Sequence, residues 1–427
     1  MFQNDEQSSQ HSKDRLALLY HLSQTFNSSL DLDEVLNRVM DEVIRATHAE
    51  RGFVMLQEED GQLLFRVARG IDQQTIGEPQ FQVSRSVVER VAHEGQPILT
   101  SDAQSDARFS MRQSVMILGL RSILCVPLML KDRNLGAIYV DNRMQAGIFS
   151  QSDLQLLTAI ASSAAIAIEN ARLYQIAVEK GRLERELQVA RQVQAGLLPQ
   201  DLPQIPGWEF IARWRPARQV AGDYYDIILH EDGRLSLVIA DVTDKGMPAA
   251  LFMALTRSFI RASMDLASSP AQGILHANRL ICADSTNGMF VTLFYALLDP
   301  ATGDLTYVNA GHNPPLLFSA GSDQPAALRR TGMALGVEVE TSYEQITLRL
   351  QPGDFIVLYT DGVVEAIDTS QQEFGIQRLK QVLLDNRNST PSSIVQALEQ
   401  DLIAFTGPTP PFDDITLLFA KRQETDY

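Results

Sequence analysis

A predicted β-hairpin at residues 221–242 constrains this chain more than any other segment, because an aspartate lies at the open end of each strand. If the polar turn 230–234 is symmetric about Asp232, Asp223 on one strand lies directly opposite Asp241 on the other. Facing like charges destabilise a pair of strands. A divalent cation between them would reverse that effect, because Mg²⁺ and Mn²⁺ prefer carboxylate ligands. The hairpin therefore predicts a metal site.

Further acidic positions flank predicted strands in the same way. Asp361 follows the apolar run 355–359, and Asp413 and Asp414 directly precede the run 415–420. In an antiparallel arrangement, strands that end at an acid and strands that begin at one can bring all of these carboxylates to one edge. These motifs contain no histidine or cysteine partner, which disfavours zinc. Each acid taken singly is also compatible with an ordinary turn or a solvated pair, so the prediction depends on the group.

The bulk composition limits the classes of function. With 427 residues the chain is long enough for two or three domains, and its net charge of −17 argues against nucleic acid or an anionic membrane as a partner. Cys125 and Cys282 lie in apolar segments, so we expect no disulfide framework and a cytoplasmic protein. Residues 1–14 lack an apolar core and are expected to be disordered rather than a secretory signal. The near-apolar stretch 157–170 is expected to be too short to span a membrane.

Residues 15–170 are predicted to form an α/β domain. A helical pattern that breaks near residues 27–33 precedes a strand pair over 51–70, and a second strand pair over 122–142 precedes an apolar helix from residue 152. This order, and the segment VPLMLKDRNLGAIYVDN in the second strand pair, resemble a GAF domain, a module that senses small molecules or other signals. The resemblance implies a sensor of unknown ligand. A purely structural dimerisation domain is the alternative.

Two details of this domain bear on its ligand. GAF domains that bind cyclic nucleotides carry an Asn-Lys…Phe…Asp-Glu pattern, which is matched only in part by Asn142, Arg143, Phe149 and Asp153, with Leu154 in place of the last acid. A cyclic nucleotide is therefore not the favoured ligand. The thiol of Cys125, within the run SILCVPLML, is expected to be buried and inert rather than a redox sensor.

Residues 171–200 are predicted to form a helical linker. Positions at alternating steps of three and four define a coiled-coil seam of Leu173, Ile176, Lys180, Leu183, Leu187, Ala190, Gln194 and Leu197. Lys180 and Gln194 are its polar members, and prolines at 199, 203 and 206 are expected to end the helix. We expect a dimeric coiled coil between sensor and effector. A single amphipathic helix packed on its own domain is the alternative.

Residues 201–422 resemble a known enzyme family. Their motifs, among them AGDYYDI, IADVTDKGMPAALFMAL, GDFIVLYTDGVVEA and FDDITLLF, are similar in wording and order to the SpoIIE-type serine phosphatases. These include RsbU-like regulators and belong to the metal-dependent PPM phosphatases. The resemblance implies an αββα sandwich with two Mn²⁺ or Mg²⁺ ions at one edge. The expected fold class is α/β (α+β), with a GAF-type sensor domain and a PPM phosphatase domain joined by a helical coiled-coil linker.

The resemblance also implies the roles of individual residues. Asp241 matches the bridging carboxylate, Asp223 matches a ligand of the second metal, and Asp361 and Asp413 match ligands of the first. The backbone carbonyl of Val242 lies where the family uses a glycine carbonyl. A metal-held water, with no protein nucleophile, would then attack the phosphate.

Neighbouring residues are candidates for secondary roles. Asp414 is the alternative to Asp413 as a ligand, and Gly362 is a candidate neighbour of the metal. Lys245 and Arg218 are candidate phosphate contacts, but solvation at the protein surface is the favoured interpretation for each. The helix that opens at 247–248 could offer backbone N–H groups to a phosphate.

Three further residues qualify the match. The family commonly has glycine where this chain has Ala221 and Asp244. Asp244 adds a charge beside the site and is expected to tune metal affinity rather than abolish catalysis. His312 is expected to stabilise a turn rather than to act as a general acid.

The leading hypothesis is a cytoplasmic protein serine/threonine phosphatase whose GAF domain receives the signal. Its substrate, by resemblance, would be a phosphorylated STAS-type anti-sigma-factor antagonist, and its partners would include a second copy joined through the linker and the GAF domain. A ligand-sensing docking protein without strong catalysis is the alternative. A metal-dependent phosphodiesterase or nuclease is the third hypothesis, and the acidic charge disfavours a nucleic-acid substrate.

Overall fold

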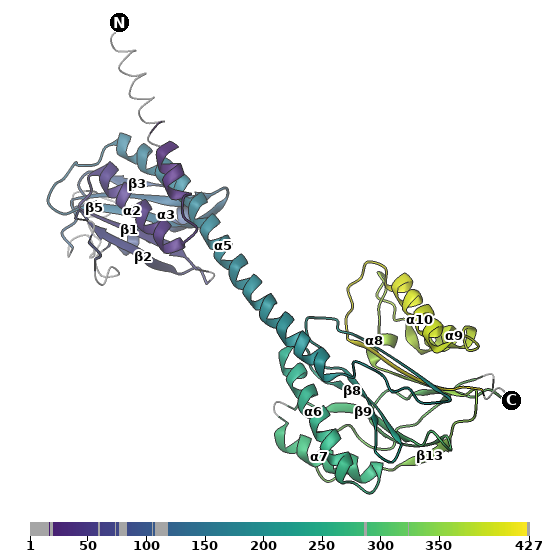
Figure 1. Ribbon diagram of the computed structural model, residues 1–427. Coiled ribbons are helices and arrows are strands. Elements are labelled where there is room, and N and C mark those ends of the chain that lie inside the picture. Colours follow the sequence, from purple (N-terminus) through teal and green to yellow (C-terminus); the bar gives the residue numbers. More distant parts are fainter. Residues whose placement is uncertain are drawn as a thin grey trace. The chain divides into compact units, whose positions relative to one another are not determined.

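The computed structural model describes residues 17, 20–58, 60–72, 74–76, 83–104, 106, 118–285, 288–322 and 324–424. The chain divides into two compact units, residues 1–182 and 183–427, and helix α5 (Gln151–Leu197) runs through the division (Figure 1). The segment 1–14, predicted to be disordered, lies outside the described residues.

The first unit contains one antiparallel five-stranded sheet with the order β2-β1-β5-β4-β3. Both predicted strand pairs are present, and a short strand, which the sequence did not suggest, adds to the edge. The strands are β1 (Arg51–Gln57), β2 (Leu63–Gly70), β3 (Ile98–Thr100), β4 (Ser122–Leu130) and β5 (Arg133–Asn142).

Helices cover both faces of this sheet. Helix α2 (Leu32–Thr47) and the first part of α5 share a core with one face, and α3 (Arg85–Glu94) packs on the other. The predicted break before α2 is confirmed, because Asp31 caps the helix by accepting a hydrogen bond from the backbone N–H of Glu34. The order of elements is therefore that of the predicted GAF-type domain.

The residues that partly match the cyclic-nucleotide pattern have local structural contacts. The Asn142 side chain accepts hydrogen bonds from the backbone N–H groups of Met144 and Gln145, at 2.9 and 2.8 Å. Asp153 accepts one from the backbone of Ser150 at the start of α5, and Phe149 lies in the core. Cys125 is buried in the sheet, and burial raises the pKa of its thiol, as expected for an inert cysteine.

The second unit is a sandwich of two antiparallel sheets, with strand orders β13-β10-β9-β8-β7 and β12-β11-β14-β15-β6. The inner faces share one core, to which α6 and α7 also contribute, and a separate core joins the second sheet to α9 and α10 (Figure 1). This is the predicted αββα arrangement. The elements are β6 (Trp208–Arg215), β7 (Tyr224–Leu229), β8 (Leu235–Val242), α6 (Met247–Leu266), α7 (Pro270–Asp284), β9 (Val291–Leu298), β10 (Asp304–Ala310), β11 (Leu316–Phe318), β12 (Ala326–Ala327), β13 (Ile346–Arg349), β14 (Phe355–Tyr359), α8 (Asp361–Val364), α9 (Gly375–Asp385), α10 (Pro391–Thr406) and β15 (Ile415–Arg422).

The predicted register of the first hairpin is confirmed. Tyr224 pairs with Ala240 and Leu229 with Leu235, so the pairing is symmetric about residue 232. Continuing this register by one residue beyond β7 places Asp223 opposite Asp241. Most residues of both strands are buried, on both faces of the sheet, so a slip by one residue would exchange the side chains that pack on the two faces.

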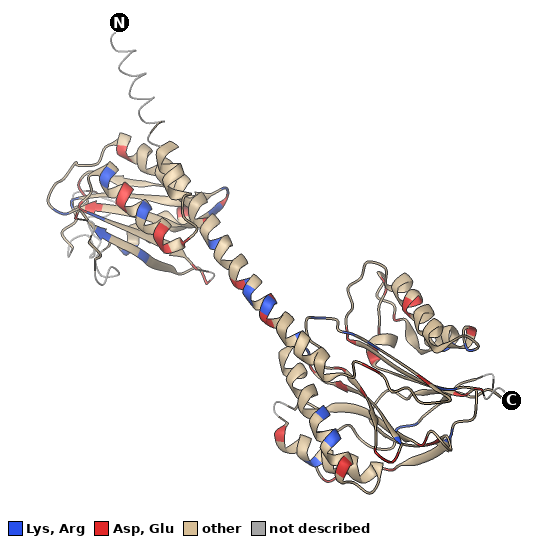
Figure 2. Ribbon diagram, in the orientation of Figure 1, with Lys and Arg blue, Asp and Glu red and all other residues tan. Residues whose placement is uncertain are grey.

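Helix α5 is one continuous helix of 47 residues, longer than the separate segments predicted from the sequence. From residue 172 to residue 193 every side chain is exposed or half-buried, and charges of both signs follow one another along this stretch (Figure 2). By length and composition α5 could cross a membrane, but 44% of its most apolar window is buried in the protein, as in a core helix. The predicted end of the helix before Pro199 is confirmed.

The assignment of Gln194 to an open coiled-coil seam is wrong. Its side chain is only 5% exposed and bonds to the backbone of the second unit. A helix that pairs with a partner helix and a helix that packs on its own chain both bury residues at steps of three and four. The spacing of residues in the sequence therefore does not distinguish these two arrangements.

Candidate metal centre

The predicted acidic residues lie at corresponding ends of neighbouring strands. Asp223 directly precedes β7, and Asp241 is the last residue but one of β8. Asp361 begins α8, two residues after the end of β14, and Asp413 lies two residues before β15. Because β7 pairs with β8 and β14 pairs with β15, each sheet brings two of these segments together. The predicted strand polarity is confirmed, although β14 ends at Tyr359 rather than at the acid itself.

Asp223 joins the two sheets. Its Oδ2 atom accepts hydrogen bonds from the hydroxyl groups of Thr360 and Thr416, both at 2.7 Å. The backbone N–H of Thr416 donates to the Thr360 hydroxyl at 3.0 Å, and the indole of Trp214 donates to the Asp223 carbonyl at 3.0 Å. The carboxylate is therefore held in place from the opposite sheet.

The motifs in the sequence do not single out the two threonines. Their only signal is a hydroxyl residue close to each acidic motif: Thr360 directly before Asp361, and Thr416 two residues after Asp414. Threonine is common in strands for reasons of packing, so this signal has little weight without the fold.

The carboxylates are close enough to perturb one another. Burial, then the charge of Asp241, raises the pKa of Asp223 well above its usual range. Burial, then the charges of Asp361 and Asp413, raises the pKa of Asp241 to about 8. Burial, then the Asp413 charge, raises the pKa of Asp361 to about 6. The site thus concentrates negative charge that the protein only partly neutralises.

The two adjacent aspartates have different partners. Both oxygens of Asp414 accept backbone hydrogen bonds at 2.8 Å, one from Ala217 and one from Gly222. Asp413 instead pairs with the Lys245 ammonium at 2.8 Å, and its side chain is 25% exposed. Asp414 therefore anchors the loop before β7, whereas Asp413 is accessible. This difference favours Asp413 as the ligand and gives Asp414 a structural role.

Lys245 brings a positive charge to the edge of the carboxylate group. Besides its ion pair with Asp413, its Nζ atom donates to the Phe412 carbonyl at 2.9 Å and lies 4.0 Å from the centre of the Phe412 ring. The expectation that the Lys245 side chain is simply solvated at the surface is therefore wrong, because the side chain is held by Asp413 and Phe412. Arg218, by contrast, is exposed, in agreement with the favoured interpretation.

The loop between β8 and α6 has unusual backbone geometry. Asp244 has a φ of 79°, a conformation that costs little only for glycine, so the replacement of the family's glycine carries strain. Gly246, with a φ of 84°, precedes the first turn of α6, where proline at residue 248 suits the helix start. The helix thus begins directly beside the acidic site.

His312 is buried inside the second unit. Its Nδ1 atom lies 2.9 Å from the Thr292 hydroxyl, and burial lowers its pKa to about 3. A neutral, enclosed imidazole agrees with the predicted structural role and does not suit a general acid.

The set of donors fits hard divalent cations better than any other group. All candidate side-chain ligands are carboxylates, as Mg²⁺ and Mn²⁺ prefer, and their mutual repulsion indicates a missing positive charge. Within the described residues, no three acidic, histidine or cysteine side chains converge at metal-ligand distance. Asp223, Asp413 and Asp414 already have hydrogen-bond or ion-pair partners, so cation binding would need these side chains to move.

Two glycines permit the close approach of these segments. A Cβ atom at Gly362 would lie 2.0 Å from the Asp414 carbonyl oxygen, so only glycine fits directly after Asp361. A Cβ atom at Gly222 would lie 2.9 Å from the Val242 carbonyl oxygen, directly before Asp223. These contacts bring the proposed ligand segments within van der Waals distance.

Substitution Gly222→Ala is expected to destabilise the protein by about 1–3 kcal/mol, because the added methyl must displace the Val242 carbonyl or the β7 strand. Urea unfolding with and without Mn²⁺ measures the effect, and the variant should also gain less stability from the ion. Gly196→Ala is the control, since nothing lies within 4 Å of that position. It should stabilise α5 by up to about 1 kcal/mol. Equal effects of the two substitutions would contradict the prediction.

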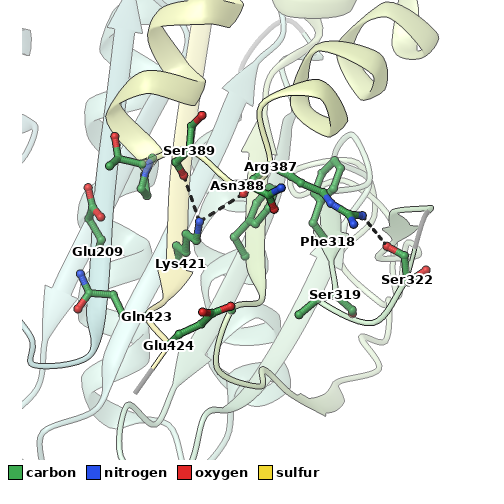
Figure 3. Close-up of a pocket in the computed structure, with 15 residues that line it drawn as sticks. Glu209, Phe318, Ser319, Ser322, Arg387, Asn388, Ser389, Lys421, Gln423 and Glu424 are labelled. Atoms are coloured by element: carbon green, nitrogen blue, oxygen red, sulfur yellow. Dashed lines mark hydrogen bonds between the residues drawn. The ribbon is translucent and has the colours of Figure 1, made fainter. Parts of the chain in front are cut away.

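A separate cavity of ≈ 520 Å³ lies in the second unit (Figure 3). Its lining includes Phe318, Ser322, Arg387, Lys421 and Glu424, and none of the predicted site residues. The Lys421 ammonium donates to the carbonyls of Arg387 and Ser389, at 3.4 and 3.2 Å. The cavity is therefore distinct from the acidic site.

Comparisons with known proteins agree with this architecture. Residues 231–423 match the family model described as Stage II sporulation protein E (SpoIIE), and residues 29–169 match that of the GAF domain. The chain is 33% identical to Protein IcfG of Synechocystis sp. over 272 residues, which cover 57% of this chain and 43% of that protein. It is 29% identical to Phosphoserine phosphatase RsbU of Bacillus subtilis over 241 residues, which cover 56% of this chain and 71% of that protein.

Among solved structures, the SiaA-PP2C domain of Pseudomonas aeruginosa superposes with a TM-score of 0.52 at 22% sequence identity, covering 58% of this chain and 100% of that domain. This likeness supports the fold. The chain spans less than half the length of the IcfG protein. Asp223 lies outside the residues matched by the SpoIIE model, and its place in the site rests on the hairpin register.

Proposed function

Because this chain is an RsbU-like protein with a SpoIIE-type PP2C phosphatase domain and an N-terminal GAF domain, we propose that it is a Mn²⁺- or Mg²⁺-dependent protein serine/threonine phosphatase. The observation that carries the proposal is the group of buried carboxylates at one edge of the sandwich. A protein that served only for docking would have no need of it. Burying like charges costs folding free energy, and bound cations would recover that cost.

In this proposal two divalent cations are held by Asp223, Asp241, Asp361, Asp413 and the carbonyl of Val242. When bound, the ions would supply an activated water molecule and positive charge for the phosphate oxygens. The threonine hydroxyls keep Asp223 oriented toward the site. The N-terminus of α6 would present backbone N–H groups to the phosphate, and Lys245 lies at the same rim.

Hydrolysis of a phosphoserine peptide and of p-nitrophenyl phosphate by the full chain tests this function. Activity is expected with Mn²⁺ or Mg²⁺, lost on chelation and restored when the ion is added back. Calorimetry with the same ions measures binding separately. Binding without hydrolysis would favour the docking protein or point to a missing activator, whereas neither binding nor hydrolysis would contradict a metallophosphatase.

We also propose that the physiological substrate is a phosphorylated STAS-type regulator in the cytoplasm. The substrate class is supported by the similarity to RsbU, whose name describes a phosphoserine phosphatase. The compartment is supported by Cys125 and Cys282, which are free thiols. The GAF domain would receive the signal. A signal can act only by stabilising one arrangement of the chain over another.

We further propose a homodimer through the exposed part of α5. Leu173, Ile176 and Leu183 are each 55% exposed and belong to the predicted seam. Burying a leucine contributes about 1.5–3 kcal/mol. Leu183→Glu in both chains should therefore raise the dimer dissociation constant by more than about tenfold, as measured by analytical ultracentrifugation. Val189→Glu, at a position 59% exposed but off the seam, is the matched control and should leave the dimer intact. A monomeric wild type would contradict the proposal.

A further inference from the structure

The end of helix α5 is attached to the second unit through one side-chain amide. The Nε2 group of Gln194 donates a hydrogen bond to the carbonyl of Ala221 at 2.9 Å, and its Oε1 accepts one from the N–H of the same residue at 3.1 Å. Nε2 also lies 3.4 Å from the Ala250 carbonyl in α6. The side chain is 5% exposed and Ala221 is fully buried. One carboxamide thus satisfies both backbone groups of a buried residue.

Ala221 lies in the segment that positions a proposed ligand. The next residue, Gly222, donates its N–H to Asp414 at 2.8 Å, and the one after it is Asp223. If Gln194 withdrew, both Ala221 groups would lose their partner away from water, and each buried polar group left without a partner costs folding free energy. Movement of the segment into another arrangement would relieve that cost and carry Asp223 with it.

The attachment coincides with a change in the burial of α5. The helix is exposed or half-buried from residue 172 to residue 193, and then Gln194 and Leu198 are both 5% exposed. Both partners of this contact belong to the second unit, so the contact is part of that unit's own fold. A displacement of the helix end would therefore reach the acidic site first at Ala221.

We propose that Gln194 is a positioning residue, which holds the 221–223 backbone in the arrangement that binds the divalent cation. Docking of the α5 end and metal affinity are thereby linked: a helix end that pulls Gln194 away lowers the affinity, and a bound cation favours the docked helix. This inference rests on the proposed function, because it assumes that Asp223 is a ligand.

Comparison of Gln194→Glu with Gln192→Glu separates the positioning of the 221–223 backbone from the general effect of adding a negative charge to α5. Glutamate at 194 keeps the shape and the acceptor but places a carboxylate oxygen against the Ala221 carbonyl, whereas Gln192 is exposed on the same helix. Calorimetry with Mn²⁺ on the full chain should show affinity weakened by about 10–100-fold in Gln194→Glu, as for other residues that orient metal ligands. Gln192→Glu should match the wild type. Amide exchange should rise at residues 221–222 in Gln194→Glu alone.

Gln194→Met is a second variant for the case in which Gln194→Glu does not fold. It removes the hydrogen bonds of the amide but keeps the side-chain volume and adds no charge. Weakened Mn²⁺ binding in this variant, with a cooperative thermal transition retained, supports the proposal. Wild-type affinity and wild-type exchange at residues 221–222 in a folded Gln194 variant would overturn it. Absence of Mn²⁺ binding in the wild type would instead overturn the proposed function and leave the exchange measurement as the test of the hydrogen bonds alone.

Discussion

Asp241→Asn is expected to lower Mn²⁺-dependent hydrolysis by more than about 100-fold, because loss of a residue that merely orients a metal ligand already costs about 10–100-fold. The same substitution is expected to raise the thermal unfolding temperature of the metal-free protein. Asparagine keeps the shape of the side chain and removes a buried charge that Asp361 and Asp413 repel. Activity and stability should thus change in opposite directions.

The pH dependence of this effect has a definite sign. The pKa of Asp241 is about 8 in the folded protein and 3.8 as an ordinary carboxyl, so the folded state binds the proton more tightly. The resulting stability is fully present below the lower value and is lost as the pH rises through about 8. The stabilising effect of Asp241→Asn on the metal-free protein should therefore grow between these limits.

Thermal unfolding from pH 5 to pH 9, with and without Mn²⁺, measures both effects. Wild type should gain about 2.7 kcal/mol when the ion is at 100 times its dissociation constant, and Asp241→Asn should gain much less. Asp201→Asn, at an exposed position, is the control for the change of charge. An Asp241→Asn protein that is both less active and less stable without metal would show that Asp241 supports the fold rather than a cation.

Arg51→Met is expected to destabilise the first unit by about 3–5 kcal/mol, because it leaves the carboxylate of Asp141 buried without its partner. The two residues are paired across β1 and β5, with Arg51 6% exposed and Asp141 fully buried. The Arg51 guanidinium binds both carboxylate oxygens. Burial raises the pKa of Asp141, an effect that the Arg51 charge opposes. Removing the cation removes that compensation.

The double variant Arg51→Met/Asp141→Leu should recover most of the lost stability, since replacing a whole buried ion pair by apolar residues is often neutral. Arg90→Met is the control, because its pair with Glu94 is exposed and should contribute only about 0.3–0.5 kcal/mol. Both tryptophans, Trp208 and Trp214, lie in the second unit, so fluorescence should follow the second unit alone, whereas circular dichroism reports the unfolding of both units. The transition that Arg51→Met shifts should therefore appear in circular dichroism and be absent from fluorescence. A loss seen equally by both probes would contradict a local effect.

The sequence predicted those features of the site that arise from local pattern. A short polar turn and alternating apolar residues fix the hairpin register, and this register alone places Asp223 opposite Asp241. The acids at 361 and 413 were found in the same way, from their position beside buried strands. Each of these predictions uses only the residues within about a dozen positions of a strand end, so each depends on local sequence pattern.

The contacts between the sheets could not be predicted in this way. Thr360 and Thr416 reach Asp223 across a sequence separation of 137 and 193 residues, and no local pattern records such a pairing. Gln194 had a misleading local signal, because its heptad position is equally consistent with a partner helix and with Ala221 of its own chain. Lys245 was misjudged for the same reason, since its partner Asp413 lies far along the chain.

The hydroxyl pair at Asp223 also determines where a proton can reside. Each threonine hydroxyl has a single hydrogen, and both are given to Oδ2, so that oxygen is already occupied as an acceptor. Burial raises the pKa of this carboxyl, and a proton that it retains therefore lies on Oδ1. Cation binding must expel this proton, so the affinity for Mn²⁺ should rise with pH, and the heat of binding should depend on the ionisation enthalpy of the buffer.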